Sequence, residues 1–284
     1  RFVTLVNEAK ALATNEIMLS SGDNFLASLT RAASDADGVD YDARVIDAIG
    51  YDALCLGNHD FDFGEQTLAD FINATTTVPF LSANLDFSSA VADLQTLETN
   101  SRIAASSIVT VNGEQIGVIG ASPINLTTIS SPGNVAVFDR AGTIAAINAE
   151  VTTLTNAGVD KIILISHFQG IDATDNTGEL QIIPDLDAGI DIVIAGGGDE
   201  LLDNGDRANL LSDEQDEDIF GSYPLTVDND GETVYVVTTP GEYRYLGRLE
   251  VQFNAAGEVV AVNGNSGLIP NRADAITGAP DTNI

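Results

Sequence analysis

Short apolar runs alternate with helical segments through the first two thirds of the sequence, and this alternation restricts the chain to an α/β fold with parallel strands. Gly, Asn or Asp residues end most of these segments. The strands are expected at 17–20, 53–56, 78–83, 161–165 and 192–195, and the helices at 2–12, 25–33, 45–49, 65–72 and 141–154.

The remaining strands indicate that part of the sheet system is antiparallel. Asn112-Gly113 stands between two apolar runs, 108–111 and 115–119, and predicts a hairpin. Late strands at 234–238 and 246–253 follow one another without a helix. No boundary is visible before about Leu268, so we expect one domain over 1–268 and a linker or tail over 269–284, where Pro, Asn, Asp and Gly accumulate.

The charge of the chain excludes several classes of partner. With 11 basic and 43 acidic residues, the formal net charge is −32. No cluster of Lys or Arg is present, which argues against a nucleic-acid duplex or an anionic membrane as partner. No apolar run reaches the 18 residues that a membrane span needs. So acidic a surface is typical of a salt-water or calcium-rich exterior, because salt screens the repulsion between fixed anions.

Polar residues of the metal-ligand type follow four of the predicted strands: Asp23, Asn58 with His59, His167, and Asp199. In open α/β sheets the carboxyl ends of parallel strands form the ligand site, so these loops are expected to meet. Each residue also has a plainer interpretation. Asp23 fits a turn with a helix cap, and His167 fits a hydrogen-bonded core histidine. The chain has only two histidines, however, and both follow a buried strand, which favours a shared site.

The strings around these residues resemble the successive motifs of the calcineurin-like metallophosphoesterases, in particular the secreted 5′-nucleotidase/2′,3′-cyclic phosphodiesterase branch. The matching strings are Gly22-Asp23-Asn24-Phe25-Leu26-Ala27-Ser28, Gly57-Asn58-His59-Asp60-Phe61-Asp62-Phe63-Gly64, Pro79-Phe80-Leu81-Ser82-Ala83-Asn84, Ser166-His167, and the segment from Thr239 to Leu249. The resemblance implies the fold of that family, two facing mixed β-sheets flanked by helices in an α/β/β/α sandwich.

The resemblance also implies a role for each residue. Asp23 would bridge two divalent metal ions, and Asn58 and His167 would bind the second of them. His59 would contact the phosphoryl group and assist the leaving oxygen, oriented by Asp62. Two cations held in this way clamp the attacking and leaving oxygens and generate hydroxide from bound water.

Two departures from the family pattern concern the metals. The family begins with an Asp-x-His motif that supplies ligands of the first metal, and this sequence starts after that point. The family's Gly-His-x-His motif is Gly196-Gly197-Gly198-Asp199 here, so Gly197 stands at the first His, and Asp199, at the second, could bind a metal through oxygen. Oxygen ligands favour Mn, Mg or Ca over Zn. Glu200 is interpreted as a solvated acid.

The sequence therefore predicts a metal-dependent hydrolase of phosphate esters that resembles a secreted 5′-nucleotidase and has a variant or incomplete two-metal site. We expect it to be secreted, either periplasmic or extracellular, and to come from a bacterium of salt water. Its expected partner is a nucleotide or other phosphate ester. By the resemblance, a C-terminal domain beyond the linker would bind the nucleoside. The alternative is a non-catalytic extracellular structural or binding module that retains the fold. Loss of the His at Gly197 favours the alternative, and retention of His59, Asp62, Asn58 and His167 favours the enzyme.

Overall fold

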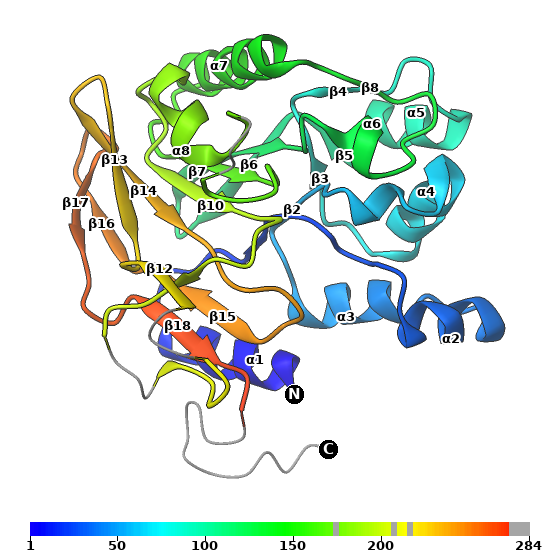
Figure 1. The fold of residues 1–284 in the computed structure, drawn as a ribbon. Coiled ribbons are helices and arrows are strands. Elements are labelled where there is room, and N and C mark those ends of the chain that lie inside the picture. The colour runs from blue at the N-terminus through cyan, green and yellow to red at the C-terminus, as the bar shows by residue number, and fades with distance from the viewer. Residues whose placement is uncertain (173–175, 206–208, 215–217, 273–284) are drawn as a thin grey trace.

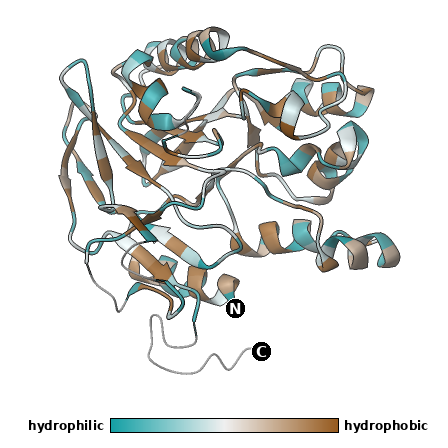
Figure 2. Cartoon of the chain, in the orientation of Figure 1, coloured by the Kyte–Doolittle hydropathy of each residue, from teal (hydrophilic) through white to brown (hydrophobic). Residues whose placement is uncertain are grey.

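Two β-sheets lie face to face at the centre of the molecule, and helices cover their outer sides (Figure 1). The structure is a computed structural model that describes residues 1–172, 176–205, 209–214 and 218–272. Figure 2 shows the central strands largely in the hydrophobic colour, as expected for strands that are covered on both faces.

The smaller sheet has four parallel strands in the order β1, β2, β3, β5. Because the strands are parallel, their carboxyl ends share one edge, where Asp23 follows β1 and Asn58 follows β2. The bounds are β1 (Leu19–Ser20), β2 (Ala53–Cys55), β3 (Phe80–Leu81) and β5 (Ile103–Ala104).

The larger sheet has six strands in the order β13, β14, β10, β9, β7, β6. Its four inner strands are parallel, and the two edge strands β6 and β13 are antiparallel to their neighbours, which confirms the predicted mixed sheet. His167 follows β9, and Asp199 lies beyond β10. The bounds are β6 (Ser106–Val111), β7 (Glu114–Ala121), β9 (Ile162–Ser166), β10 (Ile192–Ala195), β13 (Leu225–Asn229) and β14 (Glu232–Val237).

Alternation of side chains along the strands creates three apolar layers. Cys55 of β2 and Ile163 and Ile165 of β9 lie in the layer shared by the two sheets. Their neighbours Leu54 and Leu164 point the opposite way, toward the helices of each side. The α/β/β/α sandwich is therefore confirmed, because strands with period two can bury both faces only between two further layers.

Helices cover both sheets. The smaller sheet packs against α3 (Tyr41–Ile49), α4 (Gly64–Ala74) and α5 (Ala92–Thr99), and the larger sheet packs against α7 (Arg140–Asn156) and α8 (Glu179–Ile182). The other helical elements are α1 (Phe2–Leu12), α2 (Leu29–Asp37), α6 (Leu126–Ile129), η1 (His59–Phe61) and η2 (Ile183–Asp185). Within the ranges that the structure describes, no helix has the length and hydropathy needed to cross a bilayer.

The hairpin and helix-end signals were interpreted correctly. Asn112 and Gly113 have φ of 50° and 91°, the conformation of a tight turn that joins β6 to β7. Gly50 ends α3 in the left-handed region with φ of 70°. These turns are local, so the sequence alone specifies them.

The helix predicted over 25–33 was wrong at its start. α2 begins at Leu29, because Ser28 is extended and its side chain accepts a hydrogen bond from the amide of Arg31. Phe25 is instead buried in the core beneath the smaller sheet.

The strand predicted over 246–253 is two strands, each with its own partner. β15 (Tyr245–Arg248) pairs with β18 (Gly267–Pro270), and β16 (Val251–Phe253) pairs with β17 (Val259–Val262). Two further small sheets pair β4 (Leu85–Asp86) with β8 (Ala136–Val137) and β11 (Leu201–Leu202) with β12 (Ile219–Gly221). β18 crosses the predicted domain boundary at 268, and most of the predicted linker, 273–284, lies outside the described residues.

Candidate functional site

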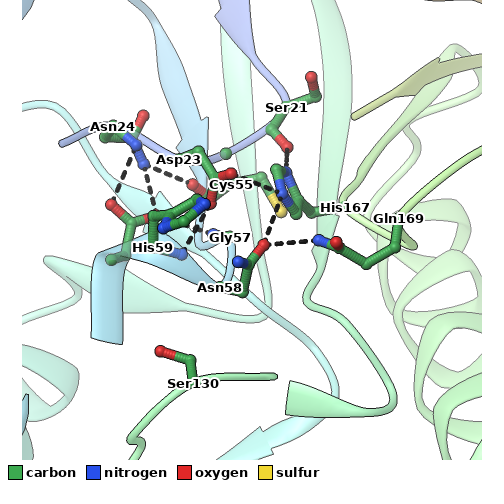
Figure 3. A network of polar contacts seen from close by, with 12 residues as sticks. Ser21, Asp23, Asn24, Cys55, Gly57, Asn58, His59, Ser130, His167 and Gln169 are labelled. Carbon is green, nitrogen blue, oxygen red and sulfur yellow. Dashed lines mark hydrogen bonds and ion pairs between the residues drawn. The ribbon is translucent and has the colours of Figure 1, made fainter. Parts of the chain in front are cut away.

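Three of the four predicted metal ligands meet where β1, β2 and β9 end (Figure 3). Nε2 of His167 lies 3.1 Å from Oδ2 of Asp23 and 3.2 Å from Oδ1 of Asn58. The site thus joins the two sheets, because Asp23 and Asn58 follow strands of the smaller sheet and His167 follows a strand of the larger one.

Contacts with the backbone fix the orientation of the His167 ring. Nδ1 lies 2.6 Å from the carbonyl oxygen of Ser21, which accepts its N–H. The ring therefore presents Nε2 to Asp23 and Asn58. An imidazole with one nitrogen tied to a carbonyl and the other facing oxygen ligands is the usual arrangement of a metal-binding histidine.

The pair Asp23–His167 stabilises the charged form of each partner. Burial raises the pKa of Asp23, but its hydrogen bond to His167 and the amide of His59 outweigh this effect, so the pKa is below its usual value. Burial lowers the pKa of His167, and the bond to Asp23 reverses this and raises the pKa.

Two glycines let the site loops approach one another. A Cβ at Gly22 would lie 2.6 Å from Nδ1 of His167, and a Cβ at Gly57 would lie 2.2 Å from Oδ1 of Asp23. Gly22 also has φ of 110°, and Asp23 has φ of 55°, in the left-handed region. Steric overlap thus explains why glycine precedes Asp23 and Asn58 in the sequence.

The imidazole of His59 lies beside this group and is partly open to solvent, with 44% of its side chain exposed. Its Nδ1 lies 2.5 Å from Oδ2 of Asp62, and its backbone N–H donates to Oδ1 of Asp23 over 2.9 Å. Burial lowers the pKa of His59, but the bond to Asp62 and the charge of Asp23 raise it above its usual value.

Asp60 is a site residue that the sequence reasoning missed. Its side chain is fully buried and accepts hydrogen bonds from the amides of Asn24 (3.0 Å) and Gly57 (2.7 Å) and from Nδ2 of Asn24 (3.1 Å). Burial, with the nearby charge of Asp23, raises its pKa to about 7. Asp60 ties the two loops that carry Asp23 and Asn58, and its position inside the Gly-Asn-His-Asp string was the signal for it.

Asp199 stays a predicted ligand, because no hydrogen bond or ion pair joins it to the three side chains that meet at the site in the part of the chain that the structure describes. Asp199 is exposed on the loop after β10, next to Gly241, where an added Cβ would lie 3.8 Å from its Oδ1. Glu200 differs from the solvated acid that we expected: its Oε1 accepts the N–H of Ile171 over 2.8 Å, and its Oε2 is buried. The glycines of this loop let the Glu200 side chain turn inward, because a Cβ at Gly198 would overlap its carboxylate.

The donors that meet here fit one divalent cation. They are a carboxylate oxygen, an amide oxygen and an imidazole nitrogen, a set that suits Mn²⁺, Mg²⁺ or Zn²⁺. In the part of the chain that the structure describes, no group of three or more His, Cys, Asp or Glu side chains could hold a metal, so the amide of Asn58 is needed to complete the set.

Comparisons with known proteins show which proteins the chain resembles in sequence and fold. The chain is 32% identical over 269 residues to the 5′-nucleotidase of Diplobatis ommata, a match that covers 94% of this chain and 42% of that protein. The structure of a 5′-nucleotidase precursor from Thermus thermophilus superposes with a TM-score of 0.78 at 30% identity, over 94% of this chain and 48% of that one. A calcineurin-like phosphoesterase of Bacillus subtilis shares the fold with a TM-score of 0.62 at 19% identity, over 93% of this chain and 82% of that one.

The chain thus spans less than half the length of the two 5′-nucleotidases that it matches. No protein-family model matches the chain.

Proposed function

Because the chain is related to the 5′-nucleotidases and has the calcineurin-like phosphoesterase fold, we propose that it is the metal-dependent phosphoesterase domain of a hydrolase that acts on nucleotides or similar phosphate esters. The observation that carries the proposal is the meeting of Asp23, Asn58 and His167 at one point, with His59 next to it.

Asp23, Asn58 and His167 would hold a divalent cation, which in such sites lowers the pKa of bound water and neutralises charge on the phosphoryl oxygens. The set of two oxygens and one nitrogen suits Mn²⁺, Mg²⁺ or Zn²⁺. Asp199 stays a predicted ligand for another cation of the family's two-metal site, and its exposed position after β10 leaves its carboxylate accessible.

His59 would assist the leaving group. Its raised pKa favours the imidazolium form, and Asp62 holds Nδ1, so the other ring nitrogen, Nε2, is free to donate a proton to the departing ester oxygen. The exposure of His59 is consistent with this role, because the substrate has to reach it.

The acidic surface supports a proposal about location. With a formal net charge of −32, the chain suits a salt-rich exterior, so we propose a secreted protein. The connection to a part of the protein that contacts the nucleoside would begin after β18, which ends at Pro270.

The experiment that tests the function is release of phosphate from adenosine 5′-monophosphate by the full-length protein. We expect hydrolysis with Mn²⁺ or Mg²⁺, its loss with a chelator, and its recovery when the metal is restored. His167→Ala should abolish it, because the variant lacks a ligand. If Mn²⁺, Mg²⁺, Ca²⁺ and Zn²⁺ all gave no hydrolysis, the proposal would be wrong, and a non-catalytic binding module would be the better account.

A further inference from the structure

The side chain of Gln169 fills the space next to Gly197, the position at which the sequence departs from the family motif. A Cβ at Gly197 would lie 2.9 Å from the Cα, the backbone nitrogen and the Nε2 of Gln169. Gly197 also has φ of 85°, which disfavours any larger residue. A side chain at 197 is thus incompatible with the observed position of Gln169.

The backbone of Gln169 is held in an uncommon conformation that directs its amide into the site. Its φ is 69°, in the left-handed region that residues other than Gly, Asn and Asp seldom adopt. Figure 3 shows the side chain extending toward Asn58, and Nε2 of Gln169 lies 2.5 Å from Oδ1 of Asn58. Conformations of this kind persist where the surrounding contacts enforce them.

This hydrogen bond fixes the direction in which Asn58 points its amide. The oxygen of Asn58 accepts the N–H of Gln169 and also faces Nε2 of His167, 3.2 Å away. An amide binds a cation through its oxygen, so a rotated amide would present N–H groups and repel the cation. With its own amide turned so that Nε2 faces Asn58, as it is here, Gln169 favours the competent orientation, because this N–H can be accepted only by the oxygen of Asn58.

We propose that Gln169 is a positioning residue for the cation site: it holds the oxygen of Asn58 toward Asp23 and His167, and Gly197 is required to give it room. The inference rests on the proposed function. It means that the absence of a side chain at Gly197 and the position of Gln169 depend on each other in this structure.

The test is titration of Mn²⁺ into the 284-residue protein by calorimetry, in 1 M sodium chloride to screen the acidic surface. Gln169→Ala should weaken binding by about 10- to 100-fold, as is typical for residues that orient a metal ligand. Gln169→Glu should weaken it at least as much, because a carboxylate cannot donate to Asn58. Gln66→Ala, at an exposed glutamine of α4, is the matched control and should bind as the unmodified protein does.

A double-mutant cycle with Asn58→Ala separates positioning from a general structural effect. If Gln169 acts through Asn58, Gln169→Ala should cost little further affinity once Asn58 is absent. Unchanged binding by Gln169→Ala would overturn the inference. Equal or tighter binding by Gln169→Glu would also overturn it, because residue 169 would then act as an oxygen ligand. If the unmodified protein bound none of Mn²⁺, Mg²⁺, Ca²⁺ and Zn²⁺, the cation site of the proposed function would be wrong, and this inference with it.

Discussion

The imidazole of His59 is held by Asp62, three residues further along, with 2.5 Å between Nδ1 and Oδ2. The other oxygen of Asp62 accepts the hydroxyl of Ser130 over 2.9 Å. His59 and Asp62 belong to one tight turn, because η1 spans His59–Phe61 and Asp62 follows it directly. The carboxylate is thus fixed through both oxygens, and it fixes the ring in turn.

This arrangement predicts that substitution of His59 lowers the rate of hydrolysis alone, whereas substitution of a metal ligand also lowers the affinity for the cation. In the full-length protein, His59→Ala should lower kcat for nucleotide hydrolysis by about 10²- to 10⁴-fold, the usual contribution of a positioned proton donor. Mn²⁺ affinity should stay unchanged, because no cation donor is removed. Asp62→Asn should also lower kcat, because Asp62 holds the ring of His59 in place. If His59→Ala lost Mn²⁺ affinity in parallel with activity, His59 would be a ligand, and its assigned role would be wrong.

The two sheets approach each other closely at Gly120, so one added methyl group there should destabilise the folded protein. A Cβ at Gly120 would lie 2.3 Å from the backbone carbonyl of Leu81 in the smaller sheet, and the carbonyl of Gly120 accepts the N–H of Ala83 over 2.8 Å. Gly120→Ala should lower the free energy of unfolding by about 1–3 kcal/mol, as overpacking does. Gly264→Ala is the control, because nothing lies within 4 Å of its Cβ position. Equal denaturant midpoints for the two variants would contradict the packing described.

The buried carboxylate of Asp191 predicts a pH dependence of stability. Burial raises its pKa to about 7, helped by the charges of Asp160 and Glu258 and opposed by the amide of Ile162 and by Lys161. Because the folded pKa lies above the unfolded value, this group's contribution to stability is full below about pH 4 and is lost as the pH rises through 7.

Asp191→Asn keeps an oxygen that can accept the N–H of Ile162, which lies 2.9 Å from Oδ2 of Asp191. The variant should therefore gain stability relative to the unmodified protein at pH 8, and most of that advantage should be gone at pH 5. Urea unfolding at both values checks this, with Asp187→Asn as an exposed control. A stability difference that is the same at pH 5 and pH 8 would show that Asp191 does not titrate in this range.

The net charge of −32 predicts stabilisation by salt. The Debye length falls from about 30 Å at 10 mM to about 3 Å at 1 M, so mutual repulsion of the surface carboxylates should weaken across this range. The melting temperature should rise between 10 mM and 1 M sodium chloride. A constant or falling melting temperature would count against the proposed salt-rich setting.

Features set by local interactions were predicted well from the sequence. The Asn112-Gly113 hairpin and the end of α3 at Gly50 depend on neighbouring residues, and they lie where expected. The start of α2 was misjudged, because burial of Phe25 in the core and capping by Ser28 outweigh the apolar periodicity of 25–33. Tertiary contacts outweigh the helix propensity of these residues.

Site residues were predictable where a motif marked them and not where long-range contacts define them. Asp23, Asn58 and His167 each follow a strand, and the parallel order of the strands brings them together. Gln169 reaches Asn58 across 111 positions in the sequence, and Glu200 reaches back 29 positions to the amide of Ile171. Neither spacing has a periodicity that a sequence can reveal, so both contacts required the structure.

The central claim, that Asp23, Asn58 and His167 form a cation site, is tested most directly by anomalous diffraction from crystals of the protein soaked in Mn²⁺. We expect a strong anomalous peak about 2.0–2.6 Å from Oδ2 of Asp23, Oδ1 of Asn58 and Nε2 of His167, and none there in crystals of His167→Ala. A well-ordered site with no peak between these three atoms, or peaks only at surface carboxylates, would contradict the account.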